Sequence, residues 1–194
     1  TIIDTKDKLT TEAEEVLNYA MWSSEPIPFD AMEIAIHEAY SNFESEDERP
    51  FFKLVHEYPL GGKPPMMTHV FENESGKKII AAKGAPEALI EVSHLSEVEK
   101  NQVLNAMKTM TSKGFRVLGV GVSDFEGTNY PVTQQALKFN FKGLVAFYDP
   151  PKHNIQAVFE TFYKAGIQVK IVTGDNAETT STIAKQVGFK NADK

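Results

Sequence analysis

Residues 77–87 read Lys-Lys-Ile-Ile-Ala-Ala-Lys-Gly-Ala-Pro-Glu, and this segment indicates how the first part of the chain folds. Its apolar residues up to Ala82 predict a strand, and Pro86 suits the first position of a helix that follows. Gly84 lies between the two elements and leaves room for the Lys83 ammonium at the strand end. From these residues alone, Lys83 is either a solvated lysine or a cation that points into a cleft.

The segments on either side predict an α+β unit, in which helices flank an antiparallel sheet. Five segments have the composition of strands, at residues 51–58, 67–72, 77–83, 115–123 and 139–149. Residues 73–76 form a hairpin-like turn between the second strand and the third. Thr11 and Asp30 each have a glutamate three residues later, which is typical of helix N-termini. A longer helix is expected to begin at Ser96 and to end near Gly114.

The sequence after Asp149 changes character and predicts a parallel α/β segment. A helix at residues 154–165 precedes residues 168–172, which have the apolar pattern of a buried strand. A second helix follows and is expected to stop at Gly188. This alternation of helix and strand predicts a parallel sheet.

A short connection, Thr173-Gly174-Asp175-Asn176, joins that strand to the second helix. Thr173 offers a hydroxyl, Gly174 allows a ligand to approach the backbone, and Asp175 adds a carboxylate. These groups lie at the carboxyl end of the predicted strand, where open α/β sheets bind their ligands. The same residues also fit an ordinary strand-to-helix turn.

The composition excludes several classes of protein. The net charge of −7 argues against a nucleic-acid binder and against docking on an anionic membrane surface. The absence of cysteine excludes disulfide scaffolds and thiolate metal sites. No apolar run reaches the roughly 18 to 20 residues of a membrane-spanning helix, so membrane insertion is not expected. The five histidines show no paired spacing, and no metal site is predicted from them.

Three motifs together resemble those of the P-type ion-pumping ATPases, in particular the calcium-pump-like branch. Lys-Gly-Ala-Pro-Glu at residues 83–87 is similar to the nucleotide-domain signature of that family, and Thr-Gly-Asp-Asn at 173–176 to its phosphate-handling motif. Between them, Asp149, Pro150 and Pro151 resemble its hinge. The resemblance implies a nucleotide-binding domain at residues 1–148. A hinge and a partial phosphorylation domain of the haloacid dehalogenase-like α/β class follow at residues 149–194.

The resemblance also implies a set of site residues. The nucleotide-binding residues would be Glu33, Tyr58, Lys63, Lys83, Gly84 and Arg116, and the phosphate-binding residues Thr173, Gly174 and Asp175. Lys83 would lie at the base of the ATP pocket, and Arg116 would reach the β-phosphate.

Two of these residues have a second interpretation from their local sequence. Tyr58 would stack on adenine, but it also fits a strand aromatic in the core. Glu33 would accept a hydrogen bond from the adenine amine, but it also completes a capping box with Asp30. Leu60 stands where many family members carry an arginine, so the resemblance does not supply that phosphate contact.

No catalytic residue is expected in this chain. The family's phosphorylated aspartate, in Asp-Lys-Thr-Gly-Thr, has no counterpart in the sequence, nor does its later magnesium-binding Gly-Asp-Gly motif. The resemblance therefore implies a piece of a membrane-embedded cation pump, on the cytoplasmic face, that works with the remaining pump domains. It would bind ATP and ADP weakly without hydrolysing ATP. The parent enzyme would use ATP as substrate together with Mg²⁺.

Two alternatives to this function were weighed. One is a non-catalytic module that binds a nucleotide or a protein. The other is a soluble haloacid dehalogenase-like phosphatase, which needs two aspartates separated by one residue, a pattern that this sequence does not contain.

Overall fold

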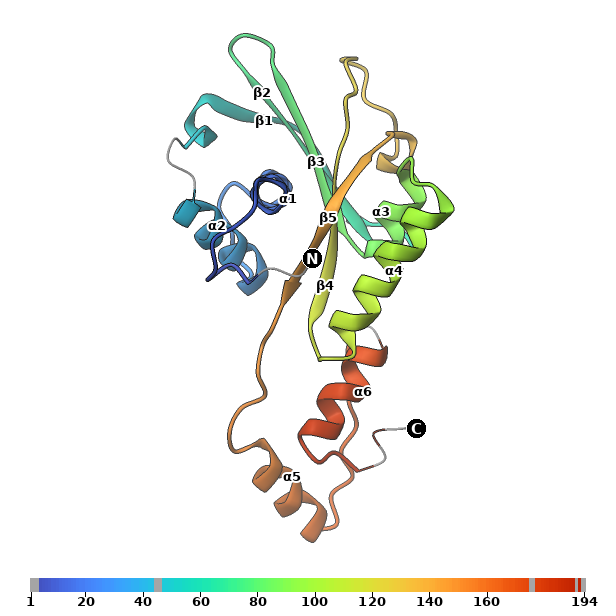
Figure 1. Cartoon of the computed structure of the whole chain (residues 1–194). Coiled ribbons are helices and arrows are strands. Elements are labelled where there is room, and N and C mark those ends of the chain that lie inside the picture. Colours follow the sequence, from blue (N-terminus) through green and yellow to red (C-terminus); the bar gives the residue numbers. More distant parts are fainter. Residues whose placement is uncertain (1–3, 44–46, 175–176, 191, 193–194) are drawn as a thin grey trace. The chain divides into compact units, whose positions relative to one another are not determined.

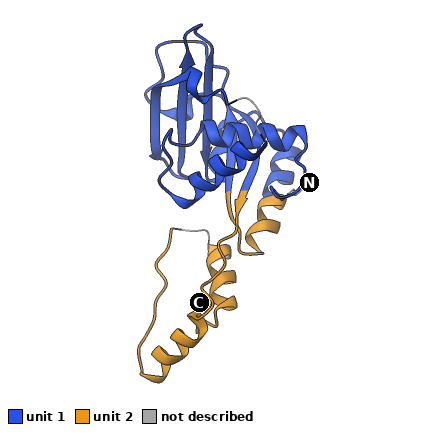
Figure 2. Ribbon diagram, turned by 90° about the vertical axis from the view of Figure 1, so that its left-hand side faces the viewer, with its two compact units in different colours: residues 1–104, 118–145 blue, residues 105–117, 146–194 orange. Residues whose placement is uncertain are grey.

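The structure, a computed structural model, describes residues 4–43, 47–174, 177–190 and 192. The chain divides into two compact units, which are coloured in Figure 2. Unit 1 comprises Thr1–Leu104 and Leu118–Val145, and unit 2 comprises Asn105–Val117 and Ala146–Lys194. Each unit is described separately below.

Unit 1 is built on a five-stranded sheet with the strands in sequence order. Its strands are β1 (Phe52–Gly61), β2 (Met66–Asn73), β3 (Lys78–Gly84), β4 (Arg116–Val122) and β5 (Asn140–Phe147). The pairs β1–β2, β2–β3 and β3–β4 are antiparallel. The predicted antiparallel sheet is therefore confirmed, with the strand ends displaced by a few residues at most.

Helices lie on both faces of this sheet (Figure 1). One face carries α1 (Thr11–Trp22) and α2 (Ala31–Phe43), and the other carries α3 (Pro86–Val92) and α4 (Glu97–Thr111). Two short 3₁₀ helices, Arg49–Phe51 and Gln134–Ala136, complete the regular structure of this part.

Alternation along the strands assigns each side chain to one face. On the α3 side, Ile80 and Ala82 of β3 pack with Leu89 of α3 in a buried cluster. On the α1 side, Phe71 of β2 meets the Trp22 ring edge-on, with the ring centroids 5.0 Å apart. The two faces therefore have separate cores, and a residue's place in the alternation decides which core it joins.

The predicted helix starts are correct to within one residue. The Asp30 carboxylate accepts from the backbone nitrogens of Met32 and Glu33, at 2.8 and 3.0 Å, as a cap requires. At α1 the cap is Thr10 and not the predicted Thr11. Thr10 has an extended backbone, and its hydroxyl accepts from a backbone nitrogen three residues later.

Unit 2 contains two helices after the last strand, α5 (Ile155–Lys164) and α6 (Ala177–Gln186). The Gln156 amide donates to the Gln186 carbonyl at 2.9 Å, and the Phe159 ring meets Phe189 edge-on. The Thr179 hydroxyl donates to the Phe115 carbonyl at 3.2 Å. Both predicted helices of this segment are thus present and in contact.

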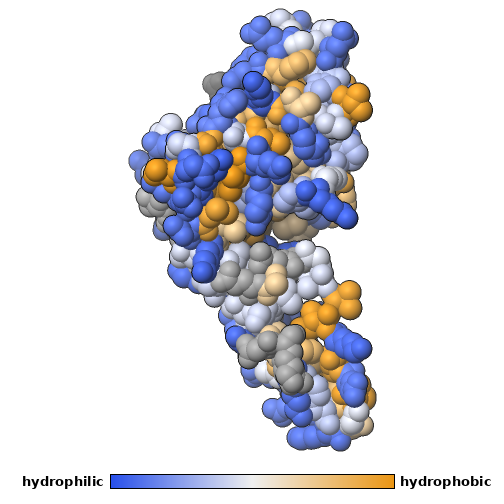
Figure 3. Space-filling model, turned by 90° about the vertical axis from the view of Figure 1, so that its right-hand side faces the viewer, coloured by the Kyte–Doolittle hydropathy of each residue, from blue (hydrophilic) through white to orange (hydrophobic). Residues whose placement is uncertain are grey.

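The predicted buried strand at residues 168–172 is wrong, because this segment has no regular structure and is largely exposed. Val172 is 97% exposed and Ile171 43% exposed, and hydrophobic side chains lie on the surface of this unit (Figure 3). A strand forms only when neighbouring strands accept and donate its backbone hydrogen bonds. Among the described residues after Phe147 there is no such strand, so the predicted parallel sheet is absent from this segment.

Gly84 permits a close approach between the end of β3 and the turn before β2. A Cβ atom at this position would lie 2.5 Å from both the Pro65 carbonyl oxygen and the Met66 Cα. Both atoms belong to the backbone and cannot rotate away. The glycine of the Lys-Gly-Ala-Pro-Glu segment is therefore required by packing.

We expect Gly84→Ala to lower the free energy of unfolding by roughly 1 to 3 kcal/mol, the usual cost of overpacking. Gly61→Ala is the matched control in the same sheet, because its new Cβ would meet only the Pro59 carbonyl oxygen at 3.6 Å. Urea denaturation of both variants measures the difference. Equal losses in the two variants would contradict the role assigned to Gly84.

Candidate functional site

Lys83 is a buried cation on the face of the sheet that carries α1 and α2. Its ammonium donates to the Glu33 carboxylate at 2.6 Å, to the Ser23 carbonyl at 2.7 Å and to the Ser24 hydroxyl at 3.0 Å. Burial lowers the pKa of Lys83, and its hydrogen bond and ion pair with Glu33 oppose that shift. The interpretation of Lys83 as a solvated lysine is therefore wrong.

Glu33, on the first turn of α2, holds its carboxylate in the same buried position. One oxygen, Oε1, accepts from the Lys83 ammonium and from the Glu25 backbone nitrogen at 3.3 Å. The other, Oε2, is buried and has no hydrogen-bond partner among the described residues. Asp30 caps the helix, so helix capping does not occupy this oxygen of Glu33.

A cavity of about 300 Å³ lies on the same face, next to this ion pair. Its apolar wall includes the rings of Trp22, Phe52 and Phe71, and its polar groups include Ser24 and Arg49. Ser24 connects the cavity to the pair, because its hydroxyl accepts from Lys83. An aromatic wall with a few polar groups is the usual composition of a small-molecule site.

The sequence analysis missed the residues of this cavity. They come from the end of α1 and the residues after it, from α2, from the 3₁₀ helix before β1, and from two strands, so no local motif connects them. The available signal was Trp22, the single tryptophan of the chain.

Tyr58 lies on the opposite face of the sheet from Lys83. Its ring belongs to the buried cluster of the α3 side, and its hydroxyl donates to the Pro131 carbonyl at 2.6 Å. Lys63 is exposed in the turn between β1 and β2 and borders a separate cavity of about 330 Å³ beside α3. The structure therefore brings Glu33 and Lys83 together but does not bring Tyr58 or Lys63 to them.

The remaining predicted residues belong to unit 2. Arg116 is exposed at the start of β4, and Thr173 and Gly174 are exposed in the segment before α6. Asp175 lies outside the described residues. Asp149 and Pro150, of the predicted hinge, have no regular structure and are exposed.

Two histidines on the α1 side, the buried His69 and the half-buried His37, have lowered pKa values, chiefly because of desolvation. The His69 Nδ1 lies 3.0 Å from the Ser24 carbonyl oxygen, which can only accept, so Nδ1 carries the proton. The Arg49 guanidinium donates to the Nδ1 of His37 at 3.1 Å, and the Arg49 charge lowers that pKa further. Both rings are therefore neutral near pH 7.

Residues 28–154 match the family described as "P-type ATPase, cytoplasmic domain N". The match covers more than half of the chain and includes the sheet of unit 1 with its buried Lys83–Glu33 pair. The chain therefore belongs to the P-type cation-transporting ATPases, and the family predicted from the three motifs is confirmed.

Individual proteins that resemble this chain are also named as cation-transporting ATPases. Calcium-transporting ATPase 1 of Saccharomyces cerevisiae is 29% identical over 95% of this chain and 22% of its own length. The sodium/potassium exporting P-type ATPase cta3 of Schizosaccharomyces pombe is 31% identical over 81% of this chain and 16% of its own length. Calcium-transporting ATPase 1 of Bacillus cereus is 27% identical over 94% of this chain and 22% of its own length. The chain thus spans about a fifth of these proteins.

Within the described ranges, no helix has both the length and the apolar composition needed to cross a bilayer.

We expect the free energy of unfolding to fall as the pH drops below about 6.5, the ordinary pKa of histidine. Below that pH the unfolded chain binds more protons at His37 and His69 than the folded chain, in which both pKa values are lowered. Urea denaturation at pH 7.5 and pH 5.5 measures this loss. His69→Gln should reduce it, and the exposed His94→Gln should not. An identical loss in all three proteins would contradict the assignment.

We expect Tyr58→Phe to lower the free energy of unfolding by about 1 kcal/mol, the net contribution of one hydrogen bond, here the bond to Pro131. Nucleotide affinity should not change, because the ring is retained. Tyr148→Phe is the control, since Tyr148 is exposed and keeps its ring contact with Phe115. Thermal or urea denaturation and a nucleotide titration of both variants provide the comparison.

Proposed function

We propose that the chain is the ATP-binding part of an ATP-driven cation pump. It would lie on the cytoplasmic face of the membrane that holds the rest of the pump. Membership of the cytoplasmic domain N family supports this proposal, as do relatives that are named cation-transporting ATPases. The phosphorylated aspartate would come from another part of the parent, and Mg²⁺ would be used there. The chain alone would bind ATP or ADP without hydrolysing ATP.

The observation that carries the proposal is the buried carboxylate oxygen Oε2 of Glu33, which has no hydrogen-bond partner among the described residues. A buried carboxylate oxygen without a donor is costly, and a ligand that supplies an N–H group removes that cost. The exocyclic amine of adenine is such a donor. In our proposal it binds Glu33 Oε2 while the base lies against the aromatic cavity wall next to Ser24.

We propose that the triphosphate extends from this position toward the cations that the sequence assigns to it. Lys83 contributes its positive charge at the base of the site, although its three N–H donors already have acceptors within the chain. Lys63 and Arg116 remain proposed phosphate contacts. Tyr58 lies on the opposite face of the sheet and does not stack on adenine in this proposed position. Gly84, which allows the end of β3 to approach the backbone of Pro65 and Met66, remains a proposed nucleotide-binding residue.

We further propose residues 1–148 as the nucleotide-binding domain and residues 149–194 as a hinge with part of the phosphorylation domain. Asp149, Pro150 and Pro151 would be the hinge. In the assembled pump, closure about them would carry the γ-phosphate toward the aspartate. Thr173, Gly174 and Asp175 would then hold the phosphoryl group.

We expect the chain to bind ATP roughly tenfold more tightly than GTP, the equivalent of one charge-assisted hydrogen bond. Guanine carries a carbonyl oxygen where adenine carries the amine, and that oxygen would face the Glu33 carboxylate. Calorimetric titration with ATP, ADP, AMP and GTP measures the preference.

Glu33→Gln should reduce the ratio of the affinity for ATP to the affinity for GTP, because a glutamine amide can donate to the guanine carbonyl. Glu38→Gln is the matched control, since Glu38 is exposed on the same helix. The control should retain the preference of the unaltered chain. Equal binding of ATP and GTP by the unaltered chain would refute the assignment of adenine to Glu33.

A further inference from the structure

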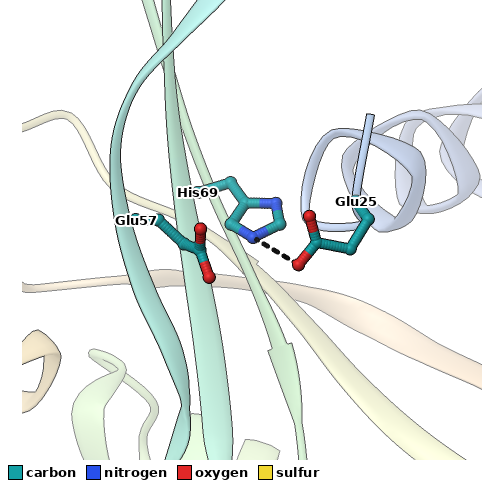
Figure 4. Close-up of side chains that lie close together, drawn as sticks. All are labelled: Glu25, Glu57 and His69. Atoms are coloured by element: carbon teal, nitrogen blue, oxygen red, sulfur yellow. Dashed lines mark ion pairs between the residues drawn. The ribbon is translucent and has the colours of Figure 1, made fainter. Parts of the chain in front are cut away.

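We propose that Glu25, Glu57 and His69 form a binding site for one divalent transition-metal ion of the Zn²⁺ type, distinct from the Lys83–Glu33 pair. Figure 4 shows the three side chains converging on one point. One ligand atom from each residue lies within 4.8 Å of the other two.

Three separate elements place these side chains together. Glu57 on β1 and His69 on β2 are directly opposite each other in the antiparallel ladder, so their side chains share one face. Glu25 follows the end of α1, and its backbone nitrogen donates to Glu33. Glu25 Oε1 lies 3.9 Å from His69 Nε2. The site is thus fixed by strand register on one side and by a helix end on the other.

The state of His69 shows that this cluster is more than a group of surface acids. The side chain is fully buried, and Nδ1–H donates to the Ser24 carbonyl, which leaves the lone pair on Nε2. Nε2 points toward the two carboxylates but has no hydrogen-bond partner in the part of the chain that is described. Carboxylates cannot donate to this lone pair, whereas a metal ion accepts it.

The hydrogen bond of Nδ1 is also the usual arrangement for a metal-ligating histidine. Such histidines donate their other ring N–H to a carbonyl or carboxylate, which orients the ring and raises its basicity. The Ser24 carbonyl performs this function here, and Ser24 is itself buried and fixed by its hydroxyl bond to the Ala20 carbonyl.

The donor set selects the class of metal. One imidazole and two carboxylates suit Zn²⁺ and neighbouring transition metals, whereas Mg²⁺ and Ca²⁺ prefer oxygen ligands alone. Ligands about 2 Å from a tetrahedral ion are roughly 3.3 Å apart, and the three ligand atoms here lie within 4.8 Å of one another, so the carboxylates must approach by up to about 1.5 Å. Glu25 and Glu57 are accessible to solvent and can make this adjustment without disturbing the core. Solvent would complete the coordination.

The sequence predicted no metal site because histidine spacing was the criterion. The three residues are 12 to 44 positions apart along the chain, and only one of them is a histidine. Strand pairing and the end of α1 bring them together.

Calorimetric titration of the 194-residue chain with ZnCl₂ at pH 7 tests the proposal. We expect saturation at one Zn²⁺ per chain, and no saturable heat with MgCl₂. Glu25→Gln and Glu57→Gln keep the side-chain shape and should each weaken Zn²⁺ binding by roughly tenfold or more. Glu74→Gln and His94→Gln, at exposed positions, are matched controls that should bind Zn²⁺ as the unaltered chain does.

Nitrogen-15 spectra of the histidine rings provide a second measurement that does not depend on any variant. Zn²⁺ should shift the Nε2 signal of His69 and leave the Nδ1 signal protonated. The proposal is overturned if Zn²⁺ binding does not saturate, if both glutamine variants bind Zn²⁺ normally, or if the His69 Nε2 signal does not move.

Discussion

The buried ion pair between Lys83 and Glu33 is the interaction on which the α1 side of unit 1 depends. Removing two charges from water is expensive, and such a pair is tolerated only when further hydrogen bonds satisfy its members. The Lys83 ammonium meets this condition, because Ser23, Ser24 and Glu33 accept its three N–H groups. The pair thereby joins the end of α1, the start of α2 and the end of β3. All three N–H groups of the cation have acceptors, whereas one buried oxygen of the anion has no hydrogen-bond partner in the part of the chain that the structure describes.

Much of the fold follows from the sequence because its signals are local. The Asp30 cap, the proline at the first position of α3 and the five strands each depend on neighbouring residues, and the structure confirms them. Residues 168–172 have the composition of a strand, but a strand also needs a partner. The described part of the chain provides none, so composition alone gave the wrong result there.

The candidate site was less predictable, because it depends on which face of the sheet a side chain occupies. The pairing of β1 with β2 shifts register between Leu54 and His56, and again between Tyr58 and Gly61. Each shift by one residue exchanges the two faces, and a sequence does not reveal where such a shift falls. Tyr58 therefore lies in the α3-side core, whereas the family resemblance had implied that it binds the nucleotide together with Lys83. The sequence analysis also did not predict the ion pair between Glu33 and Lys83, because it expected each of these side chains to contact the nucleotide and not each other.

Ser24 is hydrogen-bonded both to Lys83 and to His69, so it connects the two proposed binding sites. Its hydroxyl accepts from Lys83, and its carbonyl accepts from His69. In our proposals, a ligand that draws Lys83 away from Ser24 would shift this residue and thereby change the basicity of the imidazole. Coupling of this kind is reciprocal, so a ligand on the imidazole must alter the affinity at Lys83 by the same factor. One buried serine would thus couple two ligands that bind at different positions and do not touch.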